Sequence, residues 1–300
     1  MPLYERHPTR AFEHPVLVVV LEGWVDAGLG AEGAVSALLA VEPTELVATF
    51  DGDSLIDQRA RRPVVHLDAG VNEGLTWPVI QVRSGPDRDG RDLCYLVGPE
   101  PDFRWRPFVN DVVGLATELG VRLVVGLGAF PAPAPHTRPV RLAATAPLPS
   151  ADLVARVGIV QGELDVPSGV WGALEIAFGE AGVPAVGLWA RVPHYVSGMA
   201  FPAASAALLD GLSAVADLSF DSTALHTAAD SSLRQVDELI AKSDEHSAMV
   251  RQLERSVDTT EGNPLDLGHL PTGDELAAEL EGYLRGDRGD RSDGPAADED

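Results

Sequence analysis

The apolar positions begin with a continuous, valine-rich run at residues 16–21. Such a run is typical of a strand buried on both faces, so we expect it at the centre of a sheet. Residues 28–41 follow with alanine and leucine at helical spacing, and Pro43 ends the pattern. Residues 46–50 then predict a second strand, which completes a β-α-β unit with a right-handed crossover.

The pattern changes between residues 62 and 98. Three short β-type runs, PVVHL, WPVIQVRS and DLCYLVG, are separated by turn clusters such as SGPDRDGRD. No helix-length pattern lies between them. We therefore predict antiparallel pairing in this region.

Buried strands and helices alternate again from residue 103. The sequence predicts a helix at 103–120, a strand in VRLVVGLGA, a proline-rich loop, a strand in VRLAATA and a short helix after Ser150. A helix in VWGALEIAFGEAG, capped by Ser168 or a neighbour, a buried strand in VPAVGLWARVP and an alanine-leucine helix at 201–216 follow. The alternation indicates an α/β fold.

The composition shifts at Asp221. Residues 221–257 contain no proline or glycine, and their apolar positions recur mostly every three or four residues, which predicts one long helix with a buried stripe. Thr272 and Glu275 form a capping box for a second helix, and the acidic last fifteen residues are expected to be disordered. We divide the chain into a core domain at 1–220, a helical extension at 221–285 and an acidic tail at 286–300.

Charge and composition exclude several classes of function. The formal net charge of −24 disfavours nucleic acid and anionic membranes as partners. The one lysine, Lys242, lies in a predicted helix, so no phosphate-binding GxxxxGK loop is present. The one cysteine, Cys94, reads as a buried apolar residue. With neither a secretory signal nor an 18-residue apolar span, the expected location is the cytoplasm.

The turn after the first strand, EGWVDAGLGAEG, contains a literal GxGxxG at Gly28, Gly30 and Gly33. Dinucleotide binding is disfavoured because the first glycine comes six residues too late and the carboxylates of Glu22, Asp26 and Glu32 would repel pyrophosphate. Two interpretations remain open. The glycines let the helix pack closely on the strand, or Trp24 and Asp26 project into a ligand crevice.

Three further places carry candidate chemistry. His136 and Arg138, in the loop FPAPAPHTRPV, could grip an anion, or the loop could be a surface or oligomer contact. Glu163 with Asp165 and Ser168 in GELDVPSG, followed by Glu175, could supply a carboxylate pair for acid–base work, although capping and solvation explain the segment better. His194 ends a strand and reads as ordinary packing. The sequence contains no specific catalytic signature, and neither a metal nor a cofactor is predicted.

The order of several segments is familiar as a set: EGWVDAG after the first buried strand, GPEPDFRWRPF before a helix, GLGAFPAPAPHTRPV, and DVPSG before a helix and a strand ending in VPHY. In this order the chain resembles the PAC2 family of proteasome assembly chaperone-like proteins, especially its actinobacterial branch. The resemblance covers roughly residues 10–260. It implies a three-layer α/β/α sandwich of the phosphorylase/hydrolase-like kind with a mixed sheet and a helical C-terminal extension.

The resemblance also implies a homo-oligomer, with a trimer favoured, and a role as a protein-binding factor related to those that assemble proteasome α-subunit rings. Several family members that dock on proteasome rings end in a hydrophobic-tyrosine-any residue tail. This sequence ends in Asp298-Glu299-Asp300, so insertion of the tail is not expected.

Two hypotheses of function follow. The first is a non-enzymatic assembly or interaction protein of this family. The second is a hydrolase or phosphorylase of a small anionic metabolite, with Asp26 as base or anchor and His136 and Arg138 closing over the anion. Convergence of Trp24, Asp26, His136 and Arg138 on one cavity would separate the two.

Overall fold

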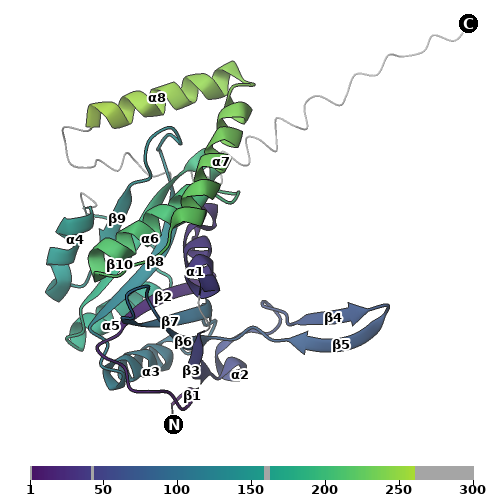
Figure 1. Cartoon of the computed structure of the whole chain (residues 1–300), viewed down its shortest axis with the longest axis vertical. Coiled ribbons are helices and arrows are strands. Elements are labelled where there is room, and N and C mark those ends of the chain that lie inside the picture. The colour runs from purple at the N-terminus through teal and green to yellow at the C-terminus, as the bar shows by residue number, and fades with distance from the viewer. Residues whose placement is uncertain (1, 42–43, 159–162, 261–300) are drawn as a thin grey trace, which may run out of the picture. The chain divides into compact units, whose positions relative to one another are not determined.

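A mixed eight-stranded sheet forms the centre of the molecule (Figure 1). The computed structural model describes residues 2–41, 44–158 and 163–260. The strand order is β1-β3-β6-β7-β2-β8-β10-β9. The strands of this sheet are β1 (Tyr4–Arg6), β2 (Val16–Glu22), β3 (Glu45–Phe50), β6 (Gln81–Pro86), β7 (Asp92–Pro99), β8 (Leu123–Ala132), β9 (Leu142–Thr145) and β10 (Ala185–Pro193).

Helices cover both faces of this sheet, so the chain is the expected three-layer α/β/α sandwich. One face carries α1 (Gly30–Val41), α4 (Ala151–Val157), α6 (Pro202–Ala216) and α7 (Thr223–Ile240). The other carries α3 (Trp105–Glu118) and α5 (Val170–Glu180), and the single-turn α2 (Gly52–Leu55) adds Leu55 to that core. In β2, Val16, Val18 and Val20 face the first layer, whereas Leu17 and Val19 face the second. The apolar run is continuous because each alternate side chain has a core of its own.

The four strands β7, β2, β8 and β10 are parallel to one another, and the remaining pairs in the sheet are antiparallel. The predicted β-α-β unit is present, because β3 runs in the same direction as β2, with β6 and β7 between them. The predicted antiparallel pairing is confirmed for β6 and β7. Strand β1 was not predicted from the sequence. It pairs with β3 at the sheet edge.

The strands β4 (Val64–Asp68) and β5 (Val71–Thr76) form a separate antiparallel pair, here called the arm. The arm stands apart from the main sheet (Figure 1). Apart from the half-buried Gly74, its residues are exposed, including apolar side chains on both strands. This pair therefore has no core of its own.

The prediction of one long helix at 221–257 is wrong. Two helices, α7 and α8 (Asp244–Thr260), are separated at residues 241–243. The break arises because Ser243 begins the second helix, its hydroxyl accepting the His246 N–H at 3.3 Å. The predicted burial of the stripe is confirmed for α7, where Ala229 and Val236 are buried against α6 and the core. The predicted helix at 272–283 and the acidic tail lie outside the described residues.

Candidate functional site

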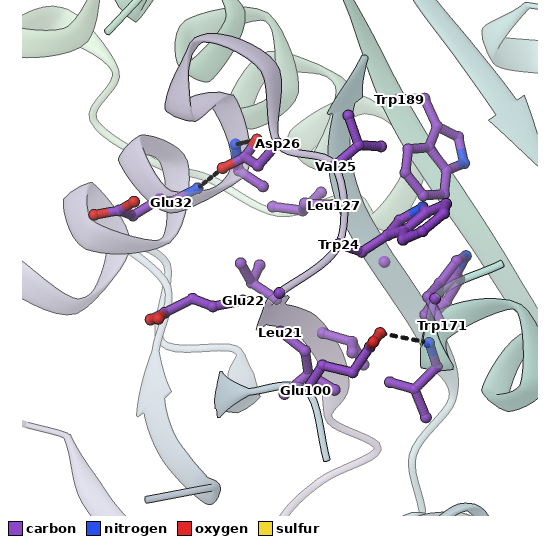
Figure 2. Close-up of a pocket in the computed structure, with 18 of the residues that line it drawn as sticks. Leu21, Glu22, Trp24, Val25, Asp26, Glu32, Glu100, Leu127, Trp171 and Trp189 are labelled. Atoms are coloured by element: carbon purple, nitrogen blue, oxygen red, sulfur yellow. Dashed lines mark hydrogen bonds between the residues drawn. The ribbon is translucent and has the colours of Figure 1, made fainter. Parts of the chain in front are cut away.

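A pocket of about 290 Å3 opens at the carboxyl ends of the parallel strands. It forms where β2 and β8 separate: they pair only from Val16–Leu123 to Val19–Gly126, whereas β2 stays paired with β7 as far as Glu22. The chain returns to β8 at Asp26, which bridges Ala129. The intervening segment, Gly23-Trp24-Val25, therefore borders the opening (Figure 2). Open α/β sheets commonly bind ligands at this edge.

Three tryptophans gather on one side of the pocket, and glycines make room for two of them (Figure 2). A Cβ atom on Gly126 would lie 2.5 Å from the Trp171 ring, and one on Gly128 would lie 2.3 Å from the Trp189 ring. Trp24 lies against Gly169, whose added Cβ would be 2.9 Å from the indole. The sheet is thinned at Gly126 and Gly128, and the indoles of Trp171 and Trp189 occupy the space.

A buried carboxylate holds two of the indoles in place. Glu175 accepts the Trp171 Nε1–H at 2.8 Å and the Thr145 hydroxyl at 2.6 Å. Thr145 in turn accepts the Trp189 Nε1–H at 3.1 Å. Burial raises the pKa of Glu175. The hydrogen bonds from Thr145 and Trp171 oppose this rise only in part. The polar edges of Trp171 and Trp189 are thus satisfied inside the protein, and their carbon surfaces line the pocket.

Two of the four carboxylates that line the pocket are tied to helix N-termini. Asp26 accepts the N–H groups of Ala31 (2.8 Å) and Glu32 (3.0 Å) at the start of α1 (Figure 2). Glu100 accepts the Val170 N–H at 2.7 Å at the start of α5. The sequence predicted a cap at Ser168 or a neighbour. The N-cap residue is the neighbour Gly169, and the Ser168 hydroxyl donates to the Gly169 carbonyl. Asp26 and Glu100 are therefore positioned as caps, where a helix dipole favours negative charge.

The glycines of the GxGxxG sequence contact protein. Gly28 has φ +66°, donates its N–H to Ser197 O and accepts from the Phe201 N–H, both at 2.8 Å. A Cβ on Gly30 would lie 2.9 Å from Ala129, and one on Gly33 would lie 2.4 Å from Ser205 Oγ. The interpretation that these glycines allow close helix packing is confirmed, with α6 as well as β8 as the neighbour.

Asp26 does not converge with His136 and Arg138 on one cavity, as the second hypothesis required. The His136 imidazole is buried, with Nδ1 2.7 Å from the Tyr195 hydroxyl and Nε2 2.9 Å from Asp237 Oδ1 on α7. Arg138 binds Asp258 on α8 through two nitrogens, at 2.9 and 2.8 Å. Neither side chain lines the pocket. The carboxylates of the two C-terminal helices, rather than a metabolite, are the anions that this loop holds.

The other sequence candidates are dispersed. Glu22 lines the pocket, and its backbone carbonyl accepts the Glu100 N–H. Glu163 and Ser168 are exposed in the segment before α5. His194 is exposed after β10, its ring edge-to-face with Tyr195. The structure therefore gives no support to the hydrolase or phosphorylase hypothesis.

Cys94 is fully buried in β7, as expected of an apolar residue. Burial raises the pKa of its thiol to about 12, so no reactive thiolate is available at neutral pH.

Within residues 2–41, 44–158 and 163–260, no group of three or more histidine, cysteine or acidic side chains could hold a metal ion. No helix in that part of the chain is both long and apolar enough to cross a membrane.

A family model for PAC2 matches residues 20–240. The chain belongs to the PAC2 family. A PAC2 family protein from Streptomyces avermitilis is 36% identical, with a TM-score of 0.69 over 79% of this chain and 99% of that chain. No curated protein matches the sequence.

Two more structures of actinobacterial proteins are similar to this PAC2 protein. A protein from Corynebacterium glutamicum is 33% identical, with a TM-score of 0.81 over 86% of this chain and 97% of that chain. The Mycobacterium tuberculosis proteasome-assembly chaperone homologue Rv2125 is 35% identical, with a TM-score of 0.72 over 78% and 99%.

Sequence reasoning missed Glu100, Trp171 and Trp189 as pocket residues of this PAC2 chain. Glu100 follows the end of β7, the parallel neighbour of β2, so its place was predictable only once the strand order was known. The glycines gave a clearer signal. GLG in β8 places two glycines on one face of a buried strand, which indicates that something bulky lies against that face.

Proposed function

We propose that this protein is a non-enzymatic protein-binding factor of the PAC2 family that acts in the assembly of proteasome α-subunits. The support is the family itself, together with the similarity to a protein described as a proteasome-assembly chaperone homologue. The expected location is the cytoplasm, where such a partner would be met.

The observation that carries the proposal is the state of the pocket and its rim. Asp26, the candidate base, has both carboxylate oxygens engaged by the backbone of α1. Around it, large apolar side chains are exposed: Trp24 by 40%, Val25 by 39% and Leu29 by 48%. A grouped apolar rim of this kind is typical of a surface that binds another protein.

A charge placed on the rim tests this proposal. Val25→Arg should slow α-subunit ring formation, or abolish binding of the subunits, in a native-gel time course with actinobacterial α-subunits. Leu148→Arg is the matched control, because Leu148 is an apolar side chain 90% exposed outside the pocket. If the unaltered protein neither binds α-subunits nor changes their assembly, the proposed function is wrong.

Homo-oligomer formation, with a trimer favoured, belongs to the same proposal. The arm supports it, since Val64, Leu67 and Val71 are 59–65% exposed and a lone two-stranded hairpin is marginally stable in water. Covering by a second copy would stabilise it. Light scattering should show an oligomer that Leu67→Asp with Val71→Asp dissociates and Leu148→Asp does not. A monomer in the unaltered protein would contradict the prediction.

A further inference from the structure

The pocket joins aromatic surface to negative charge. Trp24, Trp171 and Trp189 supply the surface, and the side chains of Glu22, Asp26, Glu32 and Glu100 supply the carboxylates. No arginine, lysine or histidine is among the described residues that line it. An indole face attracts a cation through its quadrupole, and nearby carboxylates add direct Coulombic attraction. The lining therefore selects for positive charge.

Two of the carboxylates remain open to a ligand. Glu22 and Glu32 are exposed, and among the described residues their side chains make no hydrogen bond or ion pair. The guanidinium of Arg61 lies beside Gly23 at the rim. It is paired with Asp102 at 3.3 Å, so its charge is already compensated. The rim therefore keeps a negative potential.

The indoles are also preorganised. The hydrogen bonds to Glu175 and Thr145 fix the rings of Trp171 and Trp189, and an added Cβ on Gly187 would lie within 3 Å of both indole nitrogens. A ligand would therefore not need to order these rings on binding. Rigid aromatic surfaces of this kind are typical of binding hot spots.

We propose that the pocket binds an arginine side chain of a protein partner. A planar guanidinium can stack on an indole and still donate hydrogen bonds, which a compact ammonium does less well. Figure 2 shows Glu100 on the side of the indoles and the Glu22 and Glu32 side chains across the opening, so these two add attraction at longer range. The volume of about 290 Å3 lies near the lower limit for small-ligand sites, so it suits one side chain. The exposed apolar rim and the net charge of −24 favour a basic segment of a protein over a free metabolite.

This inference deepens the proposed function and rests on it for the nature of the partner. The peptide experiment that tests it does not use proteasome subunits, so the two can fail separately. Peptide binding without α-subunit binding would overturn only the assembly role. Binding of α-subunits without peptide binding would overturn only the arginine pocket.

The test uses the full chain, whose five tryptophan indole N–H groups can be followed by NMR. The probe is the peptide acetyl-Gly-Arg-Gly-amide, and the matched control replaces arginine by citrulline, which keeps the shape and removes the charge. We expect saturable shifts of Trp24, Trp171 and Trp189, with Trp77 and Trp105 unmoved. The citrulline peptide should bind about 10-fold more weakly, as should the arginine peptide at high salt.

Variants separate stacking from general electrostatics. Trp24→Ala should weaken binding about 10-fold, whereas Trp77→Ala, at an indole exposed to a similar degree outside the pocket, should leave it unchanged. Glu22→Gln with Glu32→Gln alters only exposed side chains, and should weaken binding without affecting folding. Equal binding of the arginine and citrulline peptides would overturn the proposal. So would the absence of saturable shifts up to about 10 mM peptide.

Discussion

The pocket and the junction between the β8–β9 loop and the helices α7 and α8 both contain carboxylates, but these carboxylates serve different ends. In the junction, which we define as His136, Thr137, Arg138 and Tyr195 with Asp237, Glu254 and Asp258, each of these side chains meets another side chain of the chain. In the pocket, Glu22 and Glu32 are exposed, across the opening from the ordered indoles. His136 and Arg138, which the sequence offered as candidate binding residues, make structural contacts. The glycines of β8, in contrast, mark the position of the open pocket.

The largest effect is expected at the buried end of the junction. His136→Ala removes the imidazole that contacts Tyr195 and Asp237 and leaves a void, which should lower the free energy of unfolding by about 3 kcal/mol. The backbone N–H of residue 136 still donates to the Tyr195 hydroxyl in the variant. Urea denaturation measures this change in the free energy of unfolding. His194→Ala, an exposed histidine next to the same tyrosine, should change stability by less than about 0.5 kcal/mol. Equal effects would contradict the assignment of His136 to the core.

In the pocket, Gly126→Ala tests whether the position of the Trp171 indole depends on the absence of a side chain at Gly126. The new Cβ would overlap the Trp171 ring, so we expect a loss of about 2 kcal/mol and a changed near-ultraviolet circular dichroism spectrum. Gly114→Ala is the control in α3, where nothing lies within 4 Å of the new Cβ. It should stabilise the protein by up to about 1 kcal/mol. If Gly126→Ala changes neither the stability nor the spectrum, the Trp171 ring is not held in one position.

A smaller, pH-dependent effect is expected at Glu175. Because burial raises its pKa, ionisation costs the folded state more than the unfolded state, and its contribution to stability falls as pH rises from the ordinary carboxyl pKa to the raised one. Glu175→Gln keeps an acceptor for Trp171 and removes the titration. The variant should therefore gain stability relative to the unaltered protein across this range, measured by urea denaturation. Glu180→Gln, exposed on the same helix, is the matched control for the loss of a carboxylate from α5.

The smallest effect should come from the exposed part of the junction. Arg138→Gln removes the two-nitrogen contact with Asp258, and we expect faster hydrogen exchange in α8 with no measurable change in the urea midpoint. Arg255→Gln, on the exposed surface of α8, should leave exchange unchanged. Protection of α8 that survives Arg138→Gln would mean that Val250 and its apolar neighbours hold the helix instead.

The sequence predicted the sheet better than the site. The apolar runs at β2, β8 and β10 identified the central strands, because a strand buried on both faces cannot carry regular polar positions. It could not show that β2 and β8 separate after Val19, since that depends on pairing across more than a hundred residues. The break at Ser243 was also missed, because a cap inside a helix-compatible sequence competes with continuation of the helix.

The bond between His136 and Asp237 joins residues 101 positions apart. During synthesis on the ribosome, the imidazole is made well before its carboxylate partner, and the surface of α6 that α7 covers is exposed for the same interval. The eight strands can pair during that time, but the β8–β9 loop acquires its final polar contacts only when α7 and α8 emerge. The β8–β9 loop is therefore among the last parts of the described chain that can reach its final conformation during synthesis.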